Sequence, residues 1–161
     1  MKAVNLLLEE LDKMAPMGYT VGLHIRFATP VVYRSTYPAA WVEIYNRNSY
    51  YLRDPVVFWG VGVTGTTRWS AVPLPDPFSV MKKAAQFGLT YGAASSYGPI
   101  TSRSVIGIAR SDREFTEAEL EQLKDLTMQR DFLDAFLNPS HPGHAAAVEK
   151  KSKLTALAYP G

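Results

Sequence analysis

The sequence contains no cysteine, and this absence excludes three kinds of site. A disulfide framework, a thiolate zinc site and a cysteine nucleophile all require thiol groups. The three histidines, His24, His141 and His144, do not have the spacing of a metal-binding motif. We therefore expect a protein of the reducing cytoplasm that has no metal site.

A large excess of charge and long hydrophobic runs are also missing. The chain has 17 Lys and Arg against 15 Asp and Glu, which gives a net charge of +2 at pH 7. Nucleic-acid-binding domains usually concentrate basic residues on one face, so we do not expect this chain to bind DNA by itself. Its apolar runs are much shorter than the roughly 20 residues that span a bilayer, and its N-terminus does not resemble an export signal. No membrane partner is expected.

Motifs for catalysis and for cofactor binding are absent as well. The glycines of WGVGVTGTT and FGLTYGAASSYG lack the strand, turn and helix of a phosphate-binding loop. The hydroxyl-rich segment ASSYGPITSRS has no nucleophile elbow, and no base is evident that would activate it. We expect no catalytic residues and no cofactor, and we disfavour a lactone hydrolase.

Apolar periodicity and turn residues predict a mixture of helices and strands. The stripe that contains Val4 and Leu11 predicts a first helix over residues 3–14. Asp54 is the expected N-cap of a short helix, and Thr116 begins a capping box at the start of one long helix to residue 137. The other expected elements are helices over 38–46, 55–60 and 76–88, and strands over 19–27, 31–35, 68–71, 90–95 and 102–110.

This order of elements lacks the strand-helix-strand repetition of a parallel sheet. We therefore predict the α+β class, with a roughly five-stranded antiparallel sheet and helices on both faces. Residues 138–161 mix helix breakers, small residues and charges, which predicts a linker or a loose C-terminal tail.

The aromatic residues are crowded, since 11 of the 19 lie between Tyr19 and Trp69. Tyr37, Trp41 and Tyr45 are spaced by four residues and therefore project from one face of a helix. A stripe of this kind is usually part of a core. However, each of these side chains has a polar tip that needs a partner, and a carboxylate at Asp54 and an indole at Trp69 follow. An apolar pocket with a few oriented polar groups is typical of a small-molecule site.

These residues carry a resemblance to a known family. The segment STYPAAWVEIYNRNSYYLRDPVV, followed by RWS, FGLTYG and IARSDREFTEAEL, resembles the autoinducer-binding domain of LuxR-type quorum-sensing transcription regulators. The resemblance covers roughly residues 18–137. It implies an α-β-α sandwich that holds an N-acyl-homoserine lactone between the sheet and the helices.

The resemblance also implies a role for each matching side chain. Trp41 would donate its indole N–H to the lactone carbonyl, and Tyr37 would donate its hydroxyl to the amide carbonyl. Asp54 would accept the amide N–H of the ligand in a charge-assisted hydrogen bond. Tyr45 and Trp69 would form aromatic walls, and Trp59 is a further candidate for the pocket lining.

The chain departs from the family pattern on its last predicted strand. Family members commonly place a Ser or Thr hydroxyl there, but an alignment through ARSDREF brings Gly107 to that position. An alternative alignment brings Arg110 there, and a cation would favour an acidic ligand. Ser102 and Ser104 are possible substitutes for the missing hydroxyl. The space left by Gly107 suggests a longer or bulkier acyl chain.

A second departure is the short C-terminal part. The resemblance implies a ligand-binding domain over residues 1–137 and a DNA-binding helix-turn-helix domain, and no two-helix pattern of that kind fits within 138–161. The expected partners are an autoinducer and a second copy of the chain in a homodimer, with DNA bound only through the absent domain. Three interpretations stay open: part of an activator, a stand-alone sensor that blocks a full-length regulator by heterodimerisation, and a sensor of another small molecule.

Overall fold

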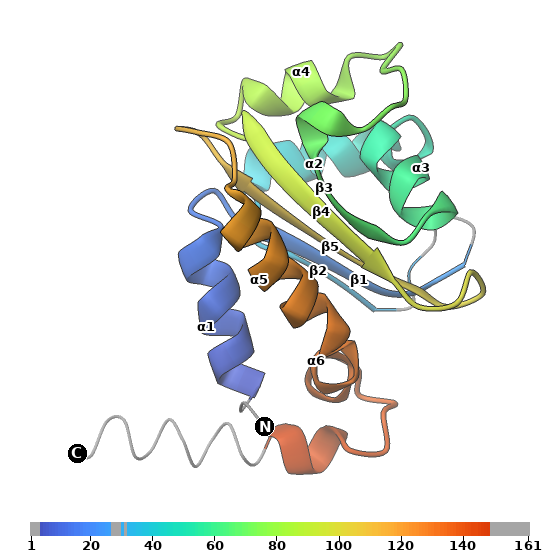
Figure 1. The fold of residues 1–161 in the computed structure, drawn as a ribbon. Helices are drawn as coiled ribbons and strands as arrows, with labels where there is room; N and C mark the ends of the chain where they lie inside the picture. Colours follow the sequence, from blue (N-terminus) through green and yellow to red (C-terminus); the bar gives the residue numbers. More distant parts are fainter. Residues whose placement is uncertain (1–3, 27–29, 31, 149–161) are drawn as a thin grey trace.

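The computed structural model describes residues 4–26, 30 and 32–148, and these residues form three layers (Figure 1). The middle layer is a five-stranded antiparallel sheet in the order β2-β1-β5-β4-β3. The strands are β1 (Tyr19–Ile25), β2 (Val32–Ser35), β3 (Gly65–Arg68), β4 (Tyr91–Tyr97) and β5 (Arg103–Arg110). The predicted fold class and the antiparallel sheet are confirmed.

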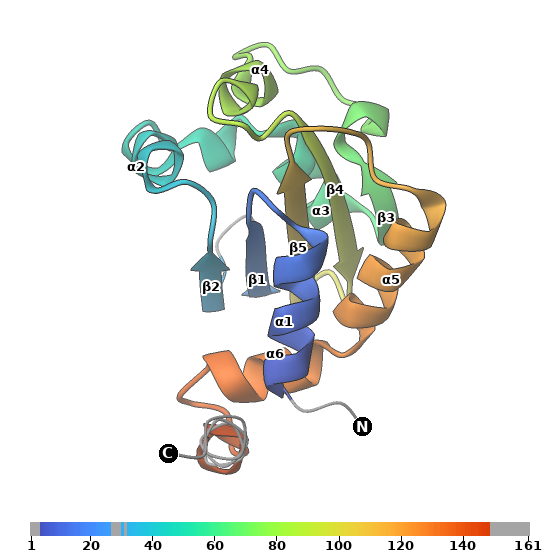
Figure 2. The ribbon, with the colours of Figure 1, turned by 90° about the vertical axis from the view of Figure 1, so that its left-hand side faces the viewer.

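Helices cover both faces of this sheet (Figures 1 and 2). One face carries α1 (Val4–Met14), α5 (Glu117–Met128) and α6 (Arg130–Leu137). The other carries α2 (Ala39–Arg47), α3 (Pro55–Gly62) and α4 (Val80–Ala85). No helix within the described residues is long and apolar enough to cross a membrane.

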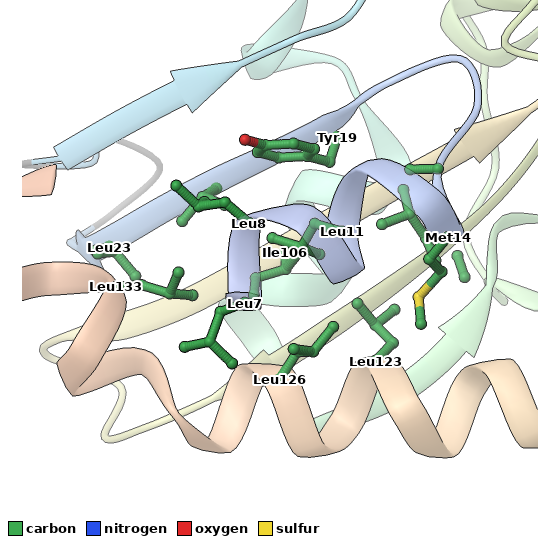
Figure 3. Close-up of a cluster of buried hydrophobic side chains, with 14 of the residues drawn as sticks. Leu7, Leu8, Leu11, Met14, Tyr19, Leu23, Ile106, Leu123, Leu126 and Leu133 are labelled. Carbon is green, nitrogen blue, oxygen red and sulfur yellow. The ribbon is translucent and has the colours of Figure 1, made fainter. Parts of the chain in front are cut away.

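The face under α1 and α5 is closed by aliphatic side chains (Figure 3). Leu7 and Leu11 of α1 are fully buried against Ile106 of the sheet and the leucines of α5. Burying one such side chain contributes about 1.5–3 kcal/mol relative to leaving it exposed. The side chain of Val4, which was expected in the stripe of the first helix, and that of Phe136 in α6 lie outside the described part. The well-packed core therefore lies on this side of the sheet.

The prediction of one long C-terminal helix is wrong, because the helix breaks at Gln129. This residue leaves the helical region, with φ −92° and ψ 24°, and its N–H bonds the Leu126 carbonyl instead of continuing the regular pattern. The change of direction lets α6 contact both α1 and β2. The predicted capping box at the start of α5 is confirmed, since Thr116 and Glu119 bond each other's backbone N–H groups.

The predicted strand over residues 68–71 is also misplaced. The strand lies earlier, at Gly65–Arg68, and Trp69–Ala71 form a 3₁₀ helix. Residues 65–68 pair with residues 93–96 of β4. The turn after Arg68 then carries Trp69 out of the sheet and onto the face covered by α2 and α4, which is where the cavity described below lies.

Two other boundaries differ from the prediction. The helix expected from Asp76 begins at Val80, and both carboxylate oxygens of Asp76 accept backbone N–H groups at its start, at 2.9 Å. In the predicted tail, residues 144–148 are helical, and His144 Nδ1 lies 2.9 Å from the Ala135 carbonyl oxygen of α6. Residues 149–161 and the expected strand positions Phe27 and Val31 lie outside the described residues.

β1 contains a bulge next to β5. Gly22 pairs with Val105, whereas Ile25 pairs with Arg103, so β1 has one residue more than its partner over this stretch. His24 takes a positive φ of 54° here. An extra residue inverts the alternation of a strand, so Thr20 and Gly22 face the same side as Ile25. Leu23 packs into the aliphatic core on the opposite side.

Candidate functional site

A cavity of about 430 Å³ lies between the sheet and helices α2, α3 and α4. Its walls are mainly apolar, and its few polar groups come from Thr20, Tyr37, Tyr45 and Asp54 among others. Tyr33 and Tyr51 also line it and keep 50% and 37% of their surfaces exposed, which places them at its mouth. The other lining residues are Gly22, Ile25, Pro30, Trp41, Asn46, Val56, Val57, Val61, Trp69, Val80, Met81, Ala84, Val105 and Gly107.

Asp54 is fixed at the cavity wall by two hydrogen bonds. Its Oδ1 accepts the Val56 N–H at 2.9 Å, so it caps α3 as predicted. Its Oδ2 accepts the Tyr45 hydroxyl at 2.8 Å. Burial raises the pKa of the Asp54 carboxyl, and the hydrogen bonds from Tyr45 and the α3 backbone oppose that rise. The Asp54 carboxylate therefore both caps α3 and lines the cavity.

Tyr45 and Tyr37 have buried hydroxyls of different character. Burial, and then the Asp54 carboxylate, raise the pKa of Tyr45, so this phenol stays a donor to Asp54. Burial also raises the pKa of Tyr37. No hydrogen bond from the Tyr37 hydroxyl to another side chain of the described residues meets standard geometry, and this hydroxyl lies above Gly107. Tyr37 therefore has a neutral O–H group for a ligand.

Trp41 lines the cavity and stands at the centre of an aromatic group that packs behind it. Its ring centroid lies 5.7 Å from Tyr45, 5.8 Å from Tyr50 and 5.5 Å from Phe87. Such edge and tilted contacts hold an indole in place more firmly than burial alone. Tyr50 and Phe87 were not predicted as part of this site. Their signal in the sequence was weak, since Tyr50 lies in a 3₁₀ helix and Phe87 lies just past α4.

Trp69 forms another wall of the cavity. It meets Tyr37 edge to face, with ring centroids 6.5 Å apart and planes at 89°. Its indole Nε1 is buried and lacks a hydrogen-bond partner within the described part of the chain. The structure thus brings the five predicted ligand-binding residues together around one cavity, which are Tyr37, Trp41, Tyr45, Asp54 and Trp69.

Of the two alternatives on β5, the structure places Gly107 at the cavity and Arg110 away from it. Strand alternation puts Val105 and Gly107 on the cavity side, so Arg110 points to the opposite face. There its guanidinium pairs with Asp112 at 2.7 Å and with Glu119 of α5 at 3.4 Å. The alternative alignment, which would place the Arg110 cation in the pocket, is therefore wrong.

Three other candidates also lie elsewhere. Val56, Val57 and Val61 share the side of α3 that faces the cavity, and Trp59 lies on another side of that helix. Ser102 and Ser104 line a second cavity, of about 290 Å³, together with His24 and Asp134. Neither serine can replace a hydroxyl at Gly107. Sequence reasoning missed several polar residues of the lining; one of them is Thr20, which alternation along β1 could have placed at the cavity.

His24 connects the sheet to α6 at this second cavity. Its Nε2 lies 2.8 Å from Asp134 Oδ2, and its Nδ1 lies 2.9 Å from Ser102 Oγ. A base therefore does lie beside a serine, contrary to the prediction. The Ser102 N–H is already bonded to the Pro99 carbonyl at 2.9 Å, so it is not free to stabilise an oxyanion. The arrangement acts as a structural link.

Asp131, Asp134 and His141 form a neighbouring group whose ligand-type atoms lie within 4.8 Å of one another. His141 Nε2 lies 3.2 Å from Asp131 Oδ1, and the Asn138 amide donates to Asp134 Oδ1 at 3.0 Å. These hydrogen bonds join α6 to the segment that follows it. Asp131 and His141 pair with each other, and Asp134 pairs with His24 and Asn138 outside the group.

Comparisons with known proteins identify the family of the chain. The family described as the autoinducer binding domain matches residues 12–134. The transcriptional activator protein SolR of Ralstonia nicotianae is 27% identical over 132 residues, covering 78% of this chain and 56% of SolR. The quorum-sensing regulator RhlR of Pseudomonas aeruginosa is 28% identical over 109 residues, covering 66% and 45%. The chain thus spans about half the length of these relatives.

Solved structures share the fold. Escherichia coli SdiA superimposes with a TM-score of 0.65 at 20% identity, covering 87% of this chain and 64% of SdiA. The N-acylhomoserine lactone dependent factor CepR2 of Burkholderia cenocepacia gives 0.60 at 16% identity, covering 85% and 86%. With a family match over most of the chain, these likenesses lead to one conclusion: the chain belongs to the autoinducer-binding domain family of LuxR-type quorum-sensing regulators.

Proposed function

We propose that residues 1–137 bind an N-acyl-homoserine lactone in the cavity between the sheet and α2, α3 and α4. The observation that carries the proposal is the buried Asp54 carboxylate, which faces an otherwise apolar cavity beside the donors of Tyr37 and Trp41. A buried carboxylate favours a ligand that brings an N–H group. An acylated amine with a carbonyl on each side of its N–H meets all three groups.

In this proposal each polar group of the ligand has one partner. The amide N–H donates to Asp54, the amide carbonyl accepts from Tyr37, and the lactone carbonyl accepts from the Trp41 indole. The acyl chain runs along the apolar lining of α3 and β5, where Val57 and Val105 lie. The stated lactone dependence of CepR2 supports this ligand class.

The proposal also explains why the fold keeps an apolar cavity that its own side chains do not fill. A ligand that binds only the folded chain stabilises it by RT ln(1 + [L]/Kd), which is about 4 kcal/mol at a thousandfold excess over Kd. We propose that occupancy of the cavity is the signal, and that it is read as a change in transcription, the activity named for SolR.

The test is thermal unfolding of the purified chain with a series of acyl-homoserine lactones from butanoyl to dodecanoyl. At saturating ligand, about 4 kcal/mol corresponds to a rise in Tm of roughly 8–16 °C for a chain of this size. Free homoserine lactone and the matching fatty acid are the control ligands, and each should raise Tm much less. If no member of the series raises Tm, the proposal is wrong.

The Trp41→Phe variant tests whether Trp41 contributes to ligand binding or only to folding. It keeps an aromatic ring among Tyr45, Tyr50 and Phe87 but removes the indole N–H. We expect weaker lactone binding with little change in the secondary structure. Unchanged affinity would mean that Trp41 is only a packing residue.

A further inference from the structure

Three buried side-chain polar atoms lack hydrogen-bond partners among the described residues: Thr20 Oγ1, Trp69 Nε1 and Arg103 Nε. Thr20 and Trp69 both line the ligand cavity. Buried polar groups are nearly always hydrogen-bonded in folded proteins, because leaving one unpaired is costly. An unpaired group at a ligand cavity therefore indicates where a ligand brings its complement.

Thr20 lies directly beside the gap at Gly107. The two residues are paired across the antiparallel ladder of β1 and β5, and both line the cavity. Directly opposite residues on one sheet face have side chains about 4.5–5.5 Å apart, so the Thr20 hydroxyl is next to the place where residue 107 has none. On their other sides, Thr20 lies opposite Ser35 of β2 and Gly107 lies opposite Ala94 of β4.

The Tyr37 hydroxyl approaches the same place from the helical side. A Cβ built on Gly107 would lie 3.0 Å from the Tyr37 oxygen, so this phenol covers the glycine. The Thr20 hydroxyl is close enough to oppose the rise in the pKa of Tyr37 that burial causes, although its Oγ1 completes no hydrogen bond. The hydroxyls of Thr20 and Tyr37 therefore converge above Gly107, and the Thr20 Oγ1 has no hydrogen-bond partner among the described residues.

We propose that Thr20 is a specificity-determining residue, and that its hydroxyl and that of Tyr37 together bind one carbonyl oxygen of the ligand above Gly107. A carbonyl oxygen has two lone pairs and accepts from both donors. This inference rests on the proposed function, and it assigns the double contact to the amide carbonyl of an N-acyl ligand. The hydroxyl that β5 lacks at Gly107 is supplied from β1.

The central experiment compares Thr20→Val, which has nearly the same shape without the oxygen, with Thr20→Ser, which keeps it. The probe is N-octanoyl-homoserine lactone, and its Kd is measured by isothermal titration calorimetry. We expect Thr20→Val to raise Kd about tenfold and Thr20→Ser to stay within about threefold of the wild type. Thr67→Val on β3, where the hydroxyl bonds the Arg68 carbonyl, is the matched control and should leave Kd unchanged.

Three further measurements distinguish a ligand contact from a structural role. Ligand-free Thr20→Val should be at least as stable as the wild type, because it loses a buried hydroxyl that has no partner. Moving the hydroxyl across the strand pair, in Thr20→Val combined with Gly107→Ser, should recover part of the lost affinity. Tyr37→Phe and Thr20→Val should be non-additive if both groups bind the same oxygen.

The outcomes are distinguishable. If the wild type binds N-octanoyl-homoserine lactone and Thr20→Val binds it equally well, the inference about Thr20 is overturned and the proposed function stands. If the ligand-free Thr20→Val variant is unfolded or clearly less stable than the wild type, Thr20 is a structural residue and the inference is again overturned. If the wild type does not bind any acyl-homoserine lactone, the proposed function fails and the inference fails with it.

Discussion

The indole of Trp69 covers the Cα of Gly92, and a Cβ at residue 92 would overlap the fused ring atoms. Gly92 lies in β4, at the register position opposite Ala109 of β5. The glycine is therefore required by the close approach of the indole to the strand, not by the conformation of its own backbone. One wall of the cavity depends on the absence of a single methyl group.

Gly92→Ala should displace Trp69 and weaken ligand binding. Overpacking of this kind costs about 1–3 kcal/mol, so the free energy of unfolding should fall by that amount. Chemical denaturation followed by tryptophan fluorescence measures the loss. Gly62→Ala is the matched control, because a Cβ at residue 62 of α3 would meet no atom within 4 Å. Equal stability of the two variants would contradict the contact.

Asp54→Asn should affect stability and binding in opposite directions. The folded pKa of this carboxyl is raised, so ionised Asp54 destabilises the fold, and that penalty grows as pH rises through the folded pKa. Asparagine removes the charge and can still cap α3, so the ligand-free variant should be at least as stable as the wild type at neutral pH. Lactone affinity should fall about tenfold or more, because the charged acceptor is lost. If the variant binds the lactone with wild-type affinity, Asp54 only caps α3 and does not bind the ligand.

Glu119 should show the reverse pH dependence. Its hydrogen bond with Arg113 lowers its pKa from 4.5 to about 2, so its stabilising contribution is present above 4.5 and is lost as pH falls toward 2. The stability difference between the wild type and Glu119→Gln should therefore shrink over that pH range. Urea denaturation as a function of pH measures it, and the exposed Glu121→Gln, on the same helix, should give a smaller difference. A difference independent of pH would exclude an ionic origin.

Asp134→Ala should loosen the link between β1 and α6 without affecting the ligand cavity. The substitution leaves the half-exposed His24 and the Asn138 amide without their acceptor, and we expect the free energy of unfolding to fall by about 1 kcal/mol. Asp131→Ala on the same helix removes a carboxylate that is 88% exposed and should cost within about 0.5 kcal/mol. Lactone affinity should be unchanged in both variants, since this link lies on the other face of the sheet.

Spacing along the chain was enough to predict much of the site. The four-residue spacing grouped Tyr37, Trp41 and Tyr45, and the family resemblance gave Asp54 and Trp69 their roles. Tyr37 reaches the cavity from the position before Pro38, the N-cap of α2, so it does not share a helix face with the other two. Thr20 was missed because its role depends on which residue lies opposite it in the sheet. The choice between Gly107 and Arg110 likewise required knowing which side of the sheet one residue of β5 faces. Strand alternation then gives the side of every other residue.

The helix break and the bulge could not be predicted for a different reason. Gln129 is an ordinary helix residue, and α6 turns there because of its contacts with α1 and β2, which local sequence does not encode. His24 adopts a positive φ within an apparently regular strand. In both places tertiary packing overrides the local preference, and glycine or proline does not mark the change.

The two faces of the sheet differ in what completes them. Leucines of α1, α5 and α6 close one face, so replacing them acts directly on folding. The other face encloses about 430 Å³ that side chains leave open. Substitutions around that space can change which molecule fits while the leucine-packed layer continues to hold the sheet. Ligand specificity can therefore change during evolution while the fold stays stable.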